Sequence, residues 1–105
     1  MAKLKFGAWI ATYAWSGGKS DPKNVKRIRE AIEKCEDHGI DVWVIDHLLS
    51  APGLYGNAGL EPLNSLAFAA ALTKKVKIAT GILVLPVRHP VVLAKEISTL
   101  CHLSE

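Results

Sequence analysis

The sequence predicts an α/β fold built from three successive strand–helix units with parallel strands. Apolar runs of strand length alternate with segments whose apolar residues recur every three or four positions, the order typical of βαβ units. The run DVWVID at 41–46 is apolar between its two acids, as expected for a strand buried on both faces of a parallel sheet. The first two strands are followed by long loops, whereas the returns to the next strand are short, as in (β/α)8 barrels.

The first unit consists of a strand at 5–10, KFGAWI, and a helix in the segment DPKNVKRIREAIEKCEDHG. Pro22 suits the first helical position, Asp21 or Ser20 can cap the N-terminus, and Gly39 is a natural stop. The apolar residues of this helix form one stripe: Val25, Ile28, Ile32 and Cys35.

The second unit joins the strand at 41–46 to a helix at about 62–73, which begins after Glu61. Its apolar face consists of Leu63, Leu66, Ala67 and Ala70. The third unit joins a strand at 76–83 to a helix that begins at Pro90. The apolar stripe of this last helix is Leu93, Ile97, Leu100 and Cys101.

The chain has 105 residues, which suits one domain over 1–105. A closed (β/α)8 barrel needs about 250 residues, so we expect the first three βα units of an incomplete barrel. A very small α/β sandwich is the alternative. Half of the residues are hydrophobic, which is high for so short a chain and indicates surface that further chain or a partner must cover. We therefore expect a homo-oligomer.

The composition argues against several classes of function. The net charge is +3, the lysines are dispersed and no aromatic residues interleave them, so we expect no binding to nucleic acid. No apolar run reaches about 18 residues and the N-terminus has no long apolar leader segment, so we expect a cytoplasmic protein without membrane contact. Neither cysteine has a partner at zinc-ligand spacing, so we expect no metal. Cys35 and Cys101 are expected to be buried free thiols.

Candidate functional residues follow the strands, because the carboxyl ends of parallel strands meet at the ligand. His47 follows the second strand and can exchange protons near neutral pH, although a polar strand end is the plainer interpretation. Asp46 beside it either contacts a ligand or anchors a neighbouring loop. The other candidates are Tyr13 and Trp15 after the first strand, and Thr80, Gly81 and Ile82 at the end of the third.

The tryptophans within the strands have two possible roles. Trp9 and Trp43 are expected to be core anchors, and stacking on a planar ligand is the alternative. Trp15 lies in the first loop, where either role is open.

The runs GIDVWVIDHLL and EPLNSLAFAAALTKKVKIATGILVLPVRHPVVLAKEISTL resemble the N-terminal part of the luciferase-like monooxygenase superfamily. This superfamily includes bacterial luciferase, FMN-dependent monooxygenases of the alkane-sulfonate type, and deazaflavin-dependent dehydrogenases and reductases. The resemblance covers nearly the whole chain, and the first loop, YAWSGGKSDP, matches least. It implies a (β/α)8 barrel of which this chain holds the first three units.

The resemblance also implies a cofactor and site roles. The cofactor would be FMN or a deazaflavin, used to oxidise a small organic substrate with oxygen or to transfer a hydride. His47 would be an acid/base or polarising partner, and the residues beside the flavin would be Asp46, Thr80, Gly81 and Ile82. The bond between Gly81 and Ile82 matches a non-prolyl cis peptide that supports the flavin ring in relatives.

Two residues of the variable first loop, Tyr13 and Trp15, are candidate substrate contacts. Arg88 is expected to hold the geometry of a loop or carboxylate. The alternative function is an inactive, truncated fragment that self-associates, and a small module that binds a planar ligand is a third hypothesis.

Overall fold

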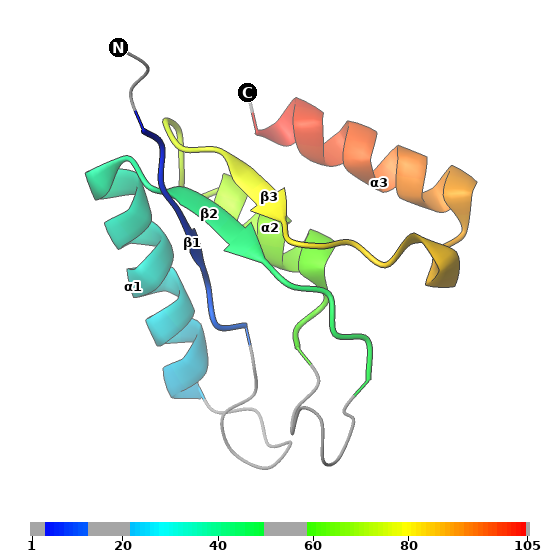
Figure 1. Cartoon of the computed structure of the whole chain (residues 1–105), viewed down its shortest axis with the longest axis horizontal. Coiled ribbons are helices and arrows are strands. Elements are labelled where there is room, and N and C mark those ends of the chain that lie inside the picture. The colour runs from blue at the N-terminus through cyan, green and yellow to red at the C-terminus, as the bar shows by residue number, and fades with distance from the viewer. Residues whose placement is uncertain (1–3, 13–21, 50–58, 105) are drawn as a thin grey trace.

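The computed structural model describes residues 4–12, 22–49 and 59–104, and its elements follow the predicted order. They are β1 (Gly7–Trp9), α1 (Pro22–His38), β2 (Asp41–Val44), α2 (Pro62–Ala70), β3 (Ile78–Thr80), the short 3₁₀ helix η1 (Leu85–Val87) and α3 (Pro90–Leu103) (Figure 1). Each predicted strand and helix is present, and each strand is shorter than the apolar run that predicted it. The helix η1 was not predicted.

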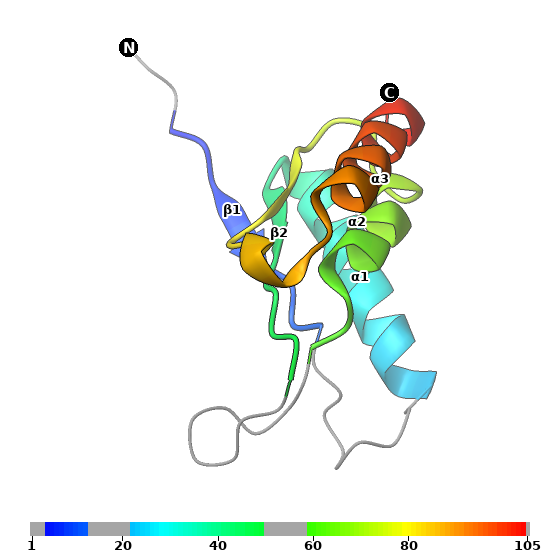
Figure 2. The ribbon, with the colours of Figure 1, turned by 90° about the vertical axis from the view of Figure 1, so that its right-hand side faces the viewer.

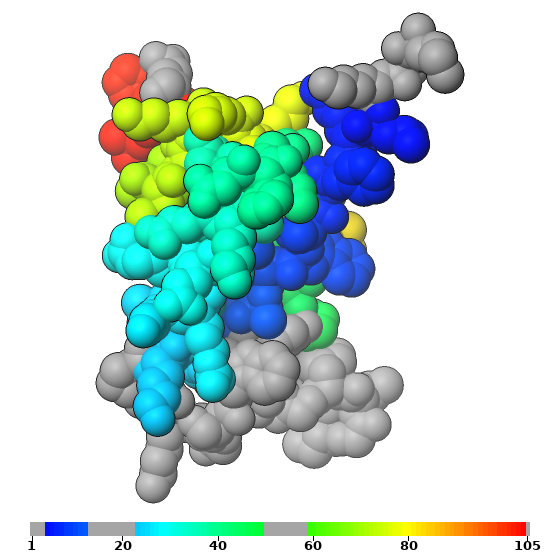
Figure 3. Space-filling model, turned by 90° about the vertical axis from the view of Figure 1, so that its left-hand side faces the viewer, coloured from blue at the N-terminus to red at the C-terminus, as the bar shows by residue number. Residues whose placement is uncertain are grey.

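The three strands form one parallel sheet in the order β1–β2–β3. Trp9 of β1, Trp43 of β2 and Ala79 of β3 lie side by side across the sheet. All three helices lie on one side of this sheet, as Figure 2 shows. At the opposite edges of the described sheet, β1 and β3 each pair on one side only, and β1 forms the surface beside α1 in Figure 3.

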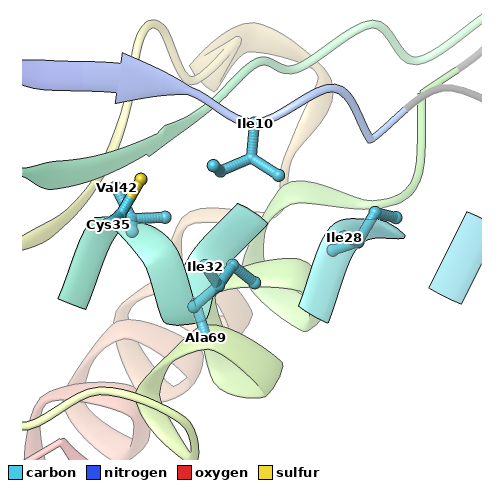
Figure 4. Close-up of a cluster of buried hydrophobic side chains, with 6 residues drawn as sticks. All are labelled: Ile10, Ile28, Ile32, Cys35, Val42 and Ala69. Atoms are coloured by element: carbon cyan, nitrogen blue, oxygen red, sulfur yellow. The ribbon is translucent and has the colours of Figure 1, made fainter. Parts of the chain in front are cut away.

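The hydrophobic core lies between the sheet and the first two helices (Figure 4). Ile32 of α1 is 2% exposed and packs in a cluster with residues from β2, α2 and the end of β1. The members of this cluster are Ile10, Ile28, Ile32, Cys35, Val42 and Ala69. The core therefore joins the first two βα units into one body.

The prediction that β2 is buried on both faces is wrong. Val42 and Val44 are buried under the helices, but Trp43 between them is 37% exposed and Trp9 is 71% exposed. Neither tryptophan is a core anchor, because successive side chains of a strand point to opposite faces and no described element covers the second face. The sheet thus has a covered face and an open face.

The predicted apolar stripes are only partly buried. Val25 of α1 and Ile97 of α3 are exposed, and in α2 the buried alanine is Ala69 rather than Ala67. Helix α3 packs on α2, so it buries Leu93 and leaves the rest of its stripe partly open. Cys101 on α3 is exposed, which corrects the prediction of two buried thiols.

Helix α1 ends as its sequence predicts. Gly39 has a φ of +67°, a left-handed conformation that favours glycine. The N–H of Ile40 donates to the carbonyl of Cys35 at 2.9 Å, and the N–H of Gly39 donates to that of Glu36 at 3.4 Å. This pair of hydrogen bonds is a Schellman motif, and it turns the chain directly into β2.

Two carboxylates tie the start of β3 to the first two units. The Glu36 carboxylate accepts hydrogen bonds from the backbone N–H groups of residues 74–76 at 3.1–3.3 Å. Asp41 Oδ1 accepts one from the N–H of Lys77 at 2.9 Å. Desolvation raises the pKa of Glu36, but the backbone hydrogen bonds outweigh this effect and leave the pKa below its ordinary value. These contacts lie at the amino ends of the strands, opposite the candidate site.

Candidate functional site

Backbone hydrogen bonds hold together the chain segments that leave the three strands. The Gly81 N–H donates to the Val44 carbonyl at 2.8 Å, so the end of β3 stays beside β2. The Leu60 N–H donates to the Thr12 carbonyl at 2.9 Å, and the Gly59 N–H donates to the His47 carbonyl at 3.3 Å. The approach to α2 therefore lies against the ends of both β1 and β2, and the carboxyl ends of the strands meet as predicted.

His47 lies three residues after β2 and is half-buried at this meeting point. Its carbonyl accepts the hydrogen bond from Gly59, which fixes its backbone next to the start of the second helical unit. This position suits the acid/base role that the sequence suggests.

The peptide bond between Gly81 and Ile82 is cis, as the family resemblance implied. Ile82 is 73% exposed and presents an apolar side chain next to this bond. Thr80 pairs in register with Val44, whose side chain is buried on the covered face, so Thr80 shares that face. Of the three residues predicted at the end of β3, Gly81 therefore faces the tryptophans of the open side, and Ile82 after it is exposed to solvent.

Trp9 and Trp43 line the open face directly beside Gly81. A Cβ atom on Gly81 would stand 2.9 Å from Cε3 of Trp43 and 3.0 Å from Nε1 of Trp9, so only glycine fits without moving an indole. A hollow of about 420 Å³ is lined by Gly7, Trp9 and Trp43. Stacking on a planar ligand was the alternative to a core role for these two tryptophans. Their exposure on the open face is compatible with that alternative.

Asp46 is held inside a network rather than on the open face. Its side chain is 1% exposed, and its Oδ2 accepts hydrogen bonds from the Val84 N–H at 3.0 Å and from Nη2 of Arg88 at 2.8 Å. Of the two roles expected for Asp46, a ligand contact and the anchoring of a neighbouring loop, these hydrogen bonds correspond to the second.

Arg88 joins this aspartate to a second carboxylate. Its Nη1 donates to Oε1 of Glu61 at 2.9 Å, while Oε2 of Glu61 accepts the N–H of Asn64 at 2.8 Å and caps α2. The hydrogen bond to Asp46 and then that to Glu61 raise the pKa of Arg88, against a lowering by desolvation. Arg88 was expected to hold the geometry of a loop or carboxylate, and its partner Glu61 was not predicted.

Two candidate residues, Tyr13 and Trp15, lie outside the described residues. Within residues 4–12, 22–49 and 59–104, no group of three or more histidine, cysteine, aspartate or glutamate side chains is arranged to hold a metal ion. In the same part of the chain, no helix is long and apolar enough to cross a membrane.

Comparison with known proteins gives this geometry a context. Residues 4–105 match the sequence model of the family described as luciferase-like monooxygenase. The alkanal monooxygenase alpha chain of Photorhabdus laumondii is 31% identical over 103 residues, which make up 97% of this chain and 27% of that protein. The alkanal monooxygenase alpha chain of the Kryptophanaron alfredi symbiont is 32% identical over 104 residues, or 28% of its length.

Two solved structures share the fold. A monooxygenase from Streptomyces bottropensis superposes with a TM-score of 0.70 at 24% identity, over 96% of this chain and 30% of its own. The oxygenating constituent of 3,6-diketocamphane monooxygenase from Pseudomonas putida, in complex with FMN, superposes with a TM-score of 0.72 at 22% identity. The match covers 97% of this chain and 27% of that protein. These neighbours are luciferase-like barrel monooxygenases, and the chain spans less than a third of each. The chain belongs to the luciferase-like monooxygenase family.

Proposed function

We propose that this chain is the N-terminal, cofactor-facing part of a flavin-dependent monooxygenase that acts on a small organic substrate. The observation that carries the proposal is the edge formed by Gly81 and Ile82, where an exposed apolar side chain follows a glycine that lies against two indoles. The P. putida relative in complex with FMN favours FMN as the cofactor.

The residues on the open side fit a flavin ring. The ring system is planar and largely apolar, and Ile82, Trp9 and Trp43 offer apolar and aromatic surface next to a glycine that permits close approach. Arg88 is engaged by Asp46 and Glu61, so its guanidinium is not available to the phosphate of FMN. The phosphate contact must therefore come from outside this network.

Bound in its reduced form, the flavin would supply two electrons to oxygen, so that one oxygen atom enters the substrate and the other leaves as water. The part of this chain is to orient the ring and to manage protons. Gly81 and Ile82 would support one face of the ring. His47 would donate or accept a proton at its imidazole, because it is half-buried at the same end of the sheet.

A titration tests the proposal. Flavin fluorescence is followed while the chain is added to FMN, with a deazaflavin in a parallel series. A Kd below about 10 μM, equivalent to roughly 7 kcal/mol, is expected for FMN. Tighter binding of the deazaflavin would move the proposal to hydride transfer, and binding of neither at about 1 mM chain, a Kd worth less than roughly 4 kcal/mol, would overturn it.

A matched pair of variants separates a specific site from adhesion to any apolar surface. Ile82→Asp places a charge beside the proposed ring, and Val91→Asp places one on α3; the two side chains are 73% and 71% exposed. Binding should weaken at least about tenfold in Ile82→Asp only, since a tenfold change corresponds to 1.4 kcal/mol. Equal weakening in both variants would contradict a site at Gly81 and Ile82.

The second candidate function is structural: the chain self-associates as a homo-oligomer without catalysis. The exposed indoles of Trp9 and Trp43 and the one-sided pairing of β1 and β3 in the described sheet favour it. Sedimentation velocity should then show a concentration-dependent oligomer, and a clean monomer at about 100 μM would count against this candidate.

Two free cysteines support a reducing compartment, and we propose the cytoplasm.

A further inference from the structure

We propose that Arg88 is a positioning residue that holds the segment 81–87 against the end of β2 and, through Glu61, against the start of α2. Its importance for a flavin rests on the proposed function, because that segment begins with the residues assigned to the ring. The bridge itself rests on hydrogen bonds between described residues.

A single carboxylate oxygen holds the segment at two points. Oδ2 of Asp46 accepts both the Val84 N–H and Nη2 of Arg88, so η1 lies between the two attachments. The N–H of Arg88 also donates to the Leu85 carbonyl at 3.0 Å and closes η1. At its other end, the segment is tied to β2 by the hydrogen bond from Gly81 to Val44. The path from β3 to α3 is thus attached at three points, Gly81, Val84 and Arg88, to the end of β2 and to Asp46 after it.

The two-way contact requires an arginine. Nη1 and Nη2 of Arg88 reach different carboxylates at 2.9 and 2.8 Å, which the planar fork of a guanidinium permits. The Asp46 side chain is 1% exposed and the Arg88 side chain is 13% exposed, so the buried charge of Asp46 depends on Arg88 for compensation. A lysine carries the same charge on a single nitrogen and would retain at most one of the two contacts in this geometry.

The bridge links three parts of the candidate site. Asp46 is the residue before His47, so holding Asp46 also fixes the backbone that carries the imidazole. Glu61 caps α2, whose approach hydrogen-bonds to the ends of β1 and β2. Through Arg88, the distance between His47 and the segment at Gly81 and Ile82 is therefore set by side chains that do not themselves face the open side.

Amide hydrogen exchange of the 105-residue chain without flavin tests the bridge directly. In Arg88→Met, the Val84 N–H should exchange at least about tenfold faster, because its acceptor Asp46 loses the compensating charge. The Val42 N–H, which donates to the Lys77 carbonyl within the sheet, should exchange as in the unchanged chain. Arg27→Met, at an exposed arginine of α1, is the matched control and should leave both rates unchanged.

Unchanged Val84 exchange in folded Arg88→Met would overturn the proposal, as would equal acceleration at Val42. If Arg88→Met does not fold, the exchange rates of Arg88→Lys decide. Partial protection of the Val84 N–H, together with loss of the side-chain contact to Glu61, supports the bridge. Full protection of the Val84 N–H refutes the need for an arginine. Flavin affinity is the separate second readout. It is expected to fall about tenfold in Arg88→Met and to recover in part in Arg88→Lys, when the two variants have equal urea midpoints and so equal stability. A chain that binds no flavin refutes the proposed function and leaves the exchange result to decide on the bridge.

Discussion

Replacing Ile32 with alanine is expected to lower the free energy of unfolding by about 3 kcal/mol. Ile32 is 2% exposed in the cluster between α1, α2 and the sheet. The change removes three buried carbons, worth about 0.8 kcal/mol each, and the cavity left behind adds further cost. Val42 and Ala69 are fully buried in the same cluster, so the surroundings can collapse only partly into the space.

Urea unfolding followed by circular dichroism measures this change. The midpoint should fall with an unchanged m-value, and the melting temperature should fall by about 12 °C at roughly 4 °C per kcal/mol. The measurement is made at two chain concentrations, because self-association would add to the apparent stability.

The control is Val25→Ala on the same helix. Val25 was predicted on the buried stripe, but the structure exposes it, so its replacement should cost less than about 0.5 kcal/mol. An Ile32→Ala cost below about 1 kcal/mol, or an equal cost at both positions, would show that α1 buries a different face. The comparison therefore tests the packing of the first unit as well as the size of one effect.

Three further predictions concern titratable and reactive groups. In the native chain, Cys101 should react rapidly with a thiol reagent, whereas Cys35 should react only on unfolding, because it is buried and its burial raises its pKa; equal rates would contradict the packing of α1. The pKa of Glu36 lies below its ordinary value of 4.5, so its contribution to stability is present above that pH and is lost as the pH falls through the folded pKa. The urea midpoints of the unchanged chain and Glu36→Gln should therefore converge as the pH falls below 4.5 and through the folded pKa, and a constant difference would refute the role of its backbone contacts. In a preparation that turns over, His47→Ala should lower kcat about 10²-fold or more and leave flavin affinity nearly unchanged, since general acid–base catalysis contributes factors of that size; an unchanged kcat would remove His47 from the mechanism.

The order and type of the elements could be predicted because they depend on local patterns. The spacing of Ile28, Ile32 and Cys35 on α1 and the glycine at Gly39 are sufficient to define that helix and its end. The strands were predicted too long because apolar residues continue past the ladder. A strand ends where its neighbour stops pairing with it, and that neighbour lies more than thirty residues away in the sequence.

The side of the sheet that is covered could not be predicted from the sequence. The run DVWV has the same letters whether one face or both are buried, and only the packing of α1 and α2 distinguishes Val42 from Trp43. The partnership of Arg88 with Glu61 was likewise hidden, since the two residues are 27 positions apart and no periodicity relates them. The sequence placed the start of α2 directly after Glu61 but showed neither its capping contact to Asn64 nor its contact to Arg88.

Carboxylates hold both ends of the sheet, but their partners differ: backbone N–H groups at the amino ends and an arginine side chain at the carboxyl ends. Substitutions at the two ends should therefore have different effects on stability and on the candidate site. At the amino ends, Glu36 accepts hydrogen bonds only from backbone groups, so that contact depends on the course of the chain and not on the identity of a partner side chain. At the carboxyl ends, Asp46 depends on Arg88, whose other contact is Glu61. Substitutions at Glu36 should therefore change the free energy of unfolding without moving the segment at Gly81. Substitutions at Arg88 displace that segment first, because the charge that compensates Asp46 is also the group that positions the loop.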